Sequence, residues 1–303
     1  MDINTILHIN MNNDISLKPN DISSNHNNAD DNYNNADNNS ISADNNYKDC
    51  DIQNVIIGKL KEIEDKENVT ILHAIESGSR AWGFASPDSD YDVRFIYVRN
   101  SMDYLMLNEP DDYIDWELNE VLDINGWDLK KALKLFHKSN ATLFEWTNSP
   151  VVYYTTPTWQ YIYANVQNYF SCKSAMYHYY GTANKNYHEY LLDDNVKYKK
   201  YFYVLRPLLA CHWIEEKKCP PPVLFDELRC VMDENIAPAI DRLLAKKITM
   251  SEADKAPRID EINHYIENGL SYYKALIENM ADDRTQSWDE LNMVFINTIM
   301  KMG

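Results

Sequence analysis

Residues 69–99 read VTILHAIESGSRAWGFASPDSDYDVRFIYVR, and the rest of the predicted fold is arranged around them. The segment Val69–Glu76 is apolar and rich in β-branched residues, which is typical of a buried strand. Gly78 and Ser79 follow directly and predict a tight turn. A second apolar segment, Val93–Val98, predicts another strand. The stretch therefore indicates a strand, a glycine turn, a loop and a second strand.

The turn and the start of the second strand carry groups suited to phosphate and metal chemistry. Glycine at residue 78 lets the backbone approach a ligand closely, and a helical turn after it would direct free N–H groups at a phosphate. Asp90 and Asp92 are two residues apart, so on a strand they point to the same face. Carboxylates beside a phosphate-binding turn suit Mg²⁺. The structural alternative is an Asx-turn, which Ser-Pro-Asp-Ser-Asp favours by itself.

A Gly-Ser turn followed by a loop and Asp-x-Asp resembles the DNA polymerase β-like nucleotidyltransferases. Longer segments look like the predicted nucleotidyltransferase family associated with bacterial RNA repair operons. These segments are ESGSRAWGFASPDSDYDVRFIYV, LDINGWDLKKALKLFHKSNATLFEWTNSPVVY and VKYKKYFYVLRPLLACHWIE. The resemblance covers roughly residues 70–225 and is absent from the first fifty residues.

The resemblance implies transfer of a nucleoside monophosphate from ATP or another NTP to a hydroxyl, with release of pyrophosphate. The acceptor would be an RNA end, a protein side chain or a small molecule. Two Mg²⁺ ions would assist, with Mn²⁺ as an alternative metal. Asp90, Asp92 and a third carboxylate on a following strand would be both the catalytic residues and the metal ligands. Asp123 is the first candidate for the third carboxylate and Asp128, which is placed to cap a helix, is the second.

Glu117 and Glu120 are more distant alternatives for the third carboxylate. Arg94 shares the strand face of the aspartates, where it would pair with an acidic neighbour or a phosphate.

Six residues are candidates for binding the nucleotide. Near the turn, the backbone of Gly78 and Ser79 would hold the β and γ phosphates, with Arg80 adding charge. The resemblance also implies that later helices cover the nucleotide. On one such helix, Lys199, Tyr203 and Arg206 share a face, so that the cations would contact the triphosphate and Tyr203 would stack on the base. The alternative is a set of surface lysines and core tyrosines.

The sequence predicts an α+β fold in three parts. Residues 1–50 are rich in Asn, Asp and Ser and predict a disordered tail. Residues 51–150 predict a nucleotidyltransferase domain, a small mixed sheet with flanking helices. Residues 151–303 predict an all-helical domain that covers the nucleotide, including a single helix over 223–247.

Composition narrows the function further. The net charge of −18 disfavours a protein that grips long nucleic acid along its backbone. Five cysteines in no paired spacing indicate reduced thiols in the cytoplasm, and neither a secretory signal nor a membrane segment is apparent. Seven glycines provide neither a dinucleotide fingerprint nor a phosphate loop. The alternatives to an enzyme are a non-catalytic nucleotide- or RNA-binding module and a toxin–antitoxin-like regulatory partner, and the intact Gly-Ser and Asp-x-Asp motifs favour the enzyme.

Overall fold

The computed structural model confirms the α+β class, with a mixed sheet and many helices. Residues 47–303 form one compact unit. The described residues are 40–86, 89–119, 121–249 and 254–302. Most of the predicted tail therefore lies outside the described residues, but helix α1 (Ser40–Glu67) begins before the Asp51 start expected from the sequence.

Within the described residues, the main sheet has five strands in the order β3-β4-β2-β1-β5. These strands are β1 (Val69–Ser77), β2 (Tyr91–Arg99), β3 (Tyr113–Leu118), β4 (Leu122–Asp128) and β5 (Val152–Thr155). Strands β2 and β4 run parallel, and the other neighbouring pairs are antiparallel. The parallel pair at the centre brings the first residues of β2 and β4 to the same end of the sheet.

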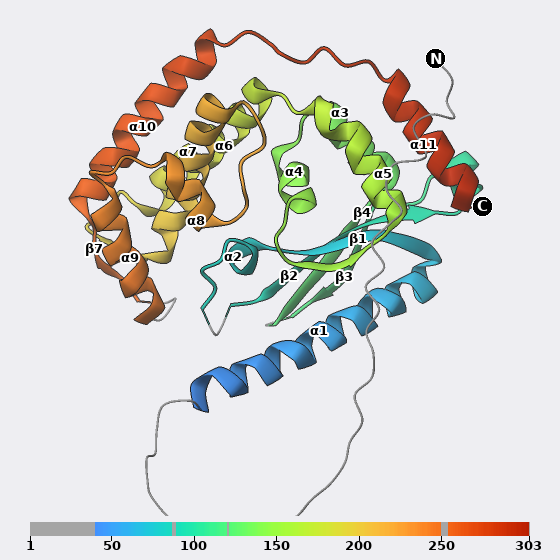
Figure 1. Ribbon diagram of the computed structural model, residues 1–303, viewed down its shortest axis with the longest axis horizontal. Helices are drawn as coiled ribbons and strands as arrows, with labels where there is room; N and C mark the ends of the chain where they lie inside the picture. The colour runs from blue at the N-terminus through green and yellow to red at the C-terminus, as the bar shows by residue number, and fades with distance from the viewer. Residues whose placement is uncertain (1–39, 87–88, 120, 250–253, 303) are drawn as a thin grey trace, which may run out of the picture. The chain divides into compact units, whose positions relative to one another are not determined.

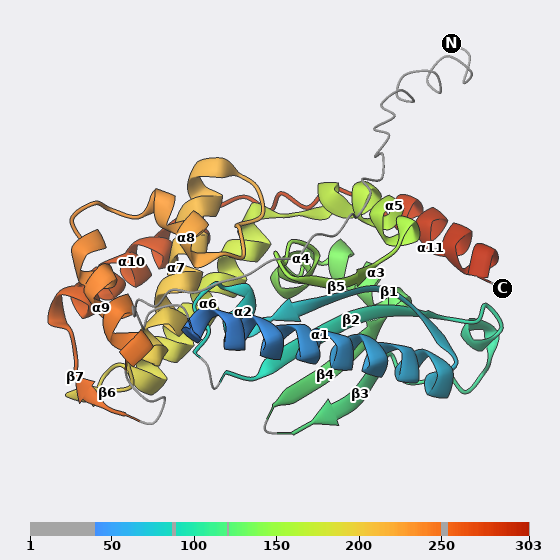
Figure 2. The same cartoon turned by 60° about the horizontal axis from the view of Figure 1, so that its bottom comes forward.

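Helix α1 covers one face of the sheet, as Figures 1 and 2 show. Its apolar residues Ile56, Leu60 and Ile63 are buried against alternate residues of the strands, such as Ala74 and Val93. Alternate strand residues face opposite sides of a sheet, so the neighbours of these residues line the other face.

The second face of the sheet is covered by α3 (Leu129–His137), α4 (Ala141–Thr147), α5 (Pro157–Val166) and α11 (Asp289–Met302). Leu291 and Val294 of α11 pack in the same core as Leu72 and Ile96 of the strands. The last helix therefore returns to the sheet, although the sequence placed it among the helices of a separate domain. Strand β5, which the sequence did not predict, also joins the sheet from that region.

The remaining helices pack around a core of their own. They include α6 (Cys172–Tyr190), α7 (Lys199–Lys217), α9 (Ala237–Thr249) and α10 (Asp260–Asn279). The single helix expected over 223–247 is wrong, because the chain forms the short α8 (Phe225–Leu228) and then α9. Between them the Asp233 side chain accepts the Asn235 N–H at 2.9 Å, a local turn that competes with helix hydrogen bonding.

The short strands β6 (Asn195–Val196) and β7 (Ala256–Pro257) pair beside this group. In the part of the chain that the structure describes, no helix is long and apolar enough to span a membrane.

Candidate active site

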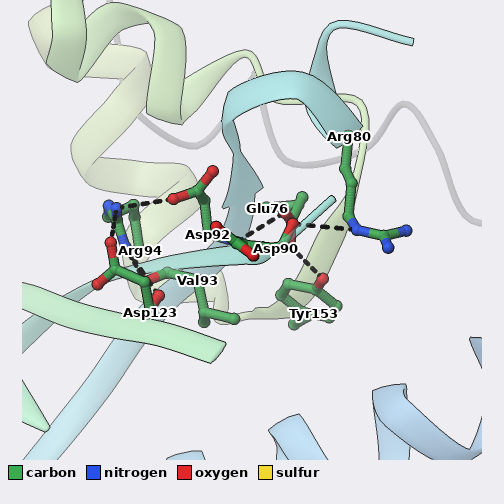
Figure 3. A network of polar contacts seen from close by, with 8 residues as sticks. All are labelled: Glu76, Arg80, Asp90, Asp92, Val93, Arg94, Asp123 and Tyr153. Carbon is green, nitrogen blue, oxygen red and sulfur yellow. Dashed lines mark hydrogen bonds and ion pairs between the residues drawn. The ribbon is translucent and has the colours of Figure 1, made fainter. Parts of the chain in front are cut away.

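Two aspartates lie side by side at the start of the central parallel strands. Asp92 of β2 and Asp123 of β4 are direct register partners. They lie on the sheet face that α3 and α5 cover further along, and each side chain remains about one-third exposed, 31% and 30% respectively. Figure 3 shows both carboxylates directed toward Arg94. Two of the three predicted catalytic residues therefore lie together, while Asp90 precedes β2 and does not share its strand face.

The glycine turn lies directly against Asp92. Gly78 has a φ of 62°, in the left-handed region that favours glycine. A Cβ atom added at this residue would lie 2.1 Å from the Asp92 Oδ2 atom, which is far inside van der Waals contact. The short helix α2 (Gly78–Ala81) begins here, so its first backbone groups, including those of Ser79, lie beside the carboxylate.

Glu76 supports this site from behind and was not predicted from the sequence. Its side chain is almost fully buried, its Oε1 atom accepts the Asp92 N–H at 2.8 Å, and its Oε2 atom accepts the Tyr153 hydroxyl. Burial raises the pKa of Glu76 to about 7, against the opposing effect of these two hydrogen bonds. One carboxylate therefore ties β1, β2 and β5 together at the end of the sheet that carries Asp92 (Figure 3). The feature of the sequence that could have indicated this role is a single acidic residue within a largely apolar strand.

Arg80 fixes the loop that leads into β2. Its Nε and Nη2 atoms donate to the carbonyls of Asp90 and Ser89 at 3.1 and 2.8 Å, and its guanidinium lies 3.6 Å from the centre of the Tyr91 ring. It also lines a cavity of about 360 Å³ together with Glu76. Contact between Arg80 and a nucleotide stays a prediction, while the structure shows its role in holding the loop.

Arg94 connects the two aspartates. Its Nη2 atom is 3.2 Å from Asp92 Oδ1 and 2.7 Å from Asp123 Oδ2. Its Nη1 atom donates to the carbonyls of Val93 and Asp123 at 3.0 and 2.8 Å. The sequence left open whether Arg94 pairs with an acid or a phosphate, and in this structure it pairs with both acids.

The charges around Asp92 show which residues are its neighbours. Burial raises the pKa of the Asp92 carboxyl, while the charge of Arg94 lowers it. Asp123 and Asp90 raise this pKa further, and Lys199 of α7 lowers it. The exposed Asp90 and the predicted phosphate-binding Lys199 therefore both lie within electrostatic range of Asp92.

Tyr203 lies one turn along α7 from Lys199, next to the turn that carries the Gly-Ser motif. Its ring meets Trp82 edge-on at 5.8 Å between centroids, and the Lys200 ammonium lies 4.6 Å from the ring centre. Trp82 ends the short helix α2, so α7 and the glycine turn are packed together through aromatic rings. Stacking of Tyr203 on a nucleobase stays a prediction.

Arg206 is buried and paired with a carboxylate. It is 5% exposed, its Nη1 atom is 3.0 Å from Glu145 Oε1, and its guanidinium lies over the Trp82 ring. The side chain therefore joins α7 to α4 in this structure. Contact of Arg206 with a triphosphate stays a prediction.

Comparison with known proteins shows the family of this chain. The sequence profile of the RNA repair pathway DNA polymerase beta family matches residues 52–297. The chain belongs to this family. It is also 41% identical over 249 residues to the uncharacterized protein YcgL of Bacillus subtilis (strain 168), across 80% of this chain and 95% of that protein.

A solved nucleotidyltransferase-like protein from Exiguobacterium sibiricum 255-15 is more distantly similar. It shares 11% identity and a TM-score of 0.30 over 74% of each chain. Membership of the family, which the sequence motifs predicted, therefore rests on the family profile and the Bacillus relative.

The alternative third carboxylate, Asp128, lies at the other end of β4. It accepts the Lys130 N–H at 2.7 Å as the N-cap of α3, and it accepts the Tyr104 hydroxyl at 2.7 Å. Its strand partner is Tyr97, not Asp92. The geometry therefore favours Asp123, while Glu120 and the side chain of Glu117 lie outside the described residues.

The residues present suit a divalent cation. Carboxylate oxygens are the preferred ligands of Mg²⁺, and Asp92 and Asp123 are register partners beside the Gly78 turn. Among the described residues, however, no three His, Cys, Asp or Glu side chains converge closely enough to hold a metal. Arg94 Nη2 contacts both the Asp92 and the Asp123 carboxylate.

Proposed function

We propose that this protein is a Mg²⁺-dependent nucleotidyltransferase that moves a nucleoside monophosphate from an NTP to a hydroxyl and releases pyrophosphate. One observation carries the proposal. Asp92 and Asp123 are register partners on parallel strands, with the backbone of Gly78 packed against Asp92. Paired carboxylates beside a glycine turn are suited to hold a metal and a polyphosphate chain together. Family membership supports the same class of reaction.

Each residue has a distinct task in this proposal. Asp92 and Asp123 would hold the metal, with the exposed Asp90 completing the ligand set. When bound, Mg²⁺ supplies the positive charge that favours attack at the α-phosphorus and departure of pyrophosphate. The hydrogen bond from Asp92 N–H to Glu76 and the contact of Asp92 with Gly78 fix the position of the first ligand.

The phosphates would be bound between the glycine turn and α7. The backbone N–H groups and hydroxyl at Ser79 provide hydrogen-bond donors, and Lys199 provides a cation that already acts on Asp92. These groups come from both sides of the site. Binding of the polyphosphate would therefore bridge the sheet and the helical part of the chain.

The net charge of −18 bears on the acceptor. A strongly acidic protein repels the phosphate backbone of long nucleic acid. The proposed acceptor is therefore a molecule, or the end of one, that contacts the protein only near the active site. The family description names an RNA repair pathway, which makes an RNA end the first acceptor to test. A protein side chain and a small molecule are the other arms of the test.

The experiment uses the full chain with each of the four α-³²P-labelled NTPs, Mg²⁺, and either total RNA, cell protein or a metabolite extract. We expect label to move to one acceptor class, to stop with EDTA, and to be absent with the Asp92→Asn variant. NTP binding without transfer to any acceptor, in the wild type, would instead support a non-catalytic nucleotide-binding module.

A further inference from the structure

We propose that Arg94 is the internal counter-ion of the metal-free site and is displaced when a divalent cation binds. The inference rests on the proposed function, because it takes Asp92 and Asp123 to be the metal ligands. It goes beyond that function by assigning Arg94 a competing role. The arginine would hold both carboxylates apart and in position until the metal replaces its bridging nitrogen.

The bridging nitrogen occupies the place that a shared cation needs. Arg94 Nη2 lies 3.2 Å from an Asp92 oxygen and 2.7 Å from an Asp123 oxygen. Magnesium binds oxygen at about 2.1 Å, so a cation bridging the same two atoms would require the carboxylates to approach by about an ångström or less each. The nitrogen and the cation cannot share that space, and one must leave.

The Nη1 atom of Arg94 would hold the side chain in place when the cation displaces Nη2. Nη1 donates to the backbone carbonyls of Val93 and Asp123, at 3.0 and 2.8 Å, and neither acceptor is a metal ligand in the proposal. The side chain is 14% exposed. When Nη2 leaves the carboxylates, Nη1 can therefore keep the side chain tethered through a backbone hydrogen bond.

The positive charge of Arg94 stabilises the two neighbouring carboxylates in the metal-free protein. Asp92 and Asp123 are neighbours in register, so without Arg94 two negative charges would face each other across parallel strands. The positive charge offsets that repulsion in the absence of metal. The same charge also opposes a divalent cation, so removing it has opposite effects on the metal-free protein and on metal affinity.

The test compares wild type with Arg94→Met, which keeps a long side chain and removes the charge. Mn²⁺ alone is titrated and free Mn²⁺ is followed by electron paramagnetic resonance, while thermal unfolding is measured without metal. We expect Arg94→Met to unfold at a lower temperature and to bind Mn²⁺ at least about tenfold more tightly. Arg94→Lys retains the charge and is expected to bind Mn²⁺ close to the wild-type affinity.

Arg99→Met is the matched control, because Arg99 ends the same strand and its Nη2 atom bonds the Asp111 carbonyl at 3.4 Å. It should leave Mn²⁺ affinity unchanged. Equal or weaker Mn²⁺ binding by Arg94→Met, or tightening by Arg94→Lys as well, would overturn the counter-ion role and leave the metal site intact. If wild type and Asp92→Asn bind Mn²⁺ equally weakly, the proposed metal site itself fails.

Discussion

Gly78 and Asp92 are so closely packed that a Cβ atom at residue 78 would lie 2.1 Å from the Asp92 Oδ2 atom. The positive φ of Gly78, 62°, lets the turn pass the end of β2 at this distance. A glycine that looks like a phosphate-binding residue in the sequence therefore also sets the position of the Asp92 carboxylate.

Gly78→Ala is expected to abolish nucleotidyl transfer while costing only about 1–2 kcal/mol of stability from the strained φ. The added methyl group must push the Asp92 carboxylate aside, so the defect is in the site more than in the fold. Transfer assays and urea unfolding measure the two effects. Gly181→Ala is the control, since a Cβ there meets nothing within 4 Å on helix α6, and it should keep full activity.

Tyr153→Phe is expected to lower the free energy of unfolding by about 1–3 kcal/mol, because the buried Glu76 carboxylate loses one of its two hydrogen bonds. Transfer should also fall, since Glu76 holds the Asp92 N–H. The neighbouring Tyr154 is 46% exposed, so Tyr154→Phe is a matched control that should change neither quantity. A stability equal to wild type in Tyr153→Phe would show that the hydroxyl contributes nothing to this network.

The buried His73 is expected to make the protein less stable in mild acid. It is 5% exposed and stacked on Trp159, and burial lowers its pKa from 6.5 to about 4. The unfolded chain takes up this proton at a higher pH than the folded chain. The free energy of unfolding is therefore highest above pH 6.5 and falls by on the order of 3 kcal/mol as the pH decreases toward 4. Urea unfolding across this range should show a shallower decline in His73→Phe. An identical decline in both proteins would contradict this assignment.

Lys199 and Arg206 should respond differently to alanine, although the sequence assigned both to the nucleotide. Arg206→Ala leaves Glu145 without its buried ion-pair partner and should cost about 3–5 kcal/mol of stability. Lys199→Ala should leave the melting temperature nearly unchanged and weaken NTP binding, because Lys199 acts on Asp92 from α7. Calorimetric titration with a non-hydrolysable NTP and thermal melts separate the two. Wild-type NTP affinity in a well-folded Lys199→Ala variant would show that Lys199 is a surface lysine that does not contribute to NTP binding.

Local patterns in the sequence predicted the two central strands that begin at Val69 and near Asp92. The apolar run Val93–Val98 and the glycine turn at Gly78 are set by neighbouring residues, so a single segment of sequence displays them. The family resemblance favoured Asp123 over Asp128, and the parallel register of β2 and β4 places Asp123 beside Asp92.

Features that depend on distant contacts were missed. Glu76 is the only acidic residue in the largely apolar strand β1, and its role is visible only once Tyr153, far along the chain, bonds it. Arg206 resembles a surface cation until folding buries it against Glu145. The return of α11 to the sheet depends on Leu291 and Val294 finding a core formed much earlier in the sequence.

The most direct test of a metal-dependent transfer site compares Asp92→Asn, Asp123→Asn and Asp128→Asn in the Mg²⁺-dependent NTP-labelling assay, with thermal melts as a check on folding. Asp92 and Asp123 are register partners, while Asp128 caps α3 at the far end of β4. We predict that the first two variants fold and lose transfer by orders of magnitude, because the site loses a carboxylate ligand. Asp128→Asn should retain transfer in proportion to its folded fraction. Full activity in a folded Asp92→Asn or Asp123→Asn variant would contradict the proposed active site.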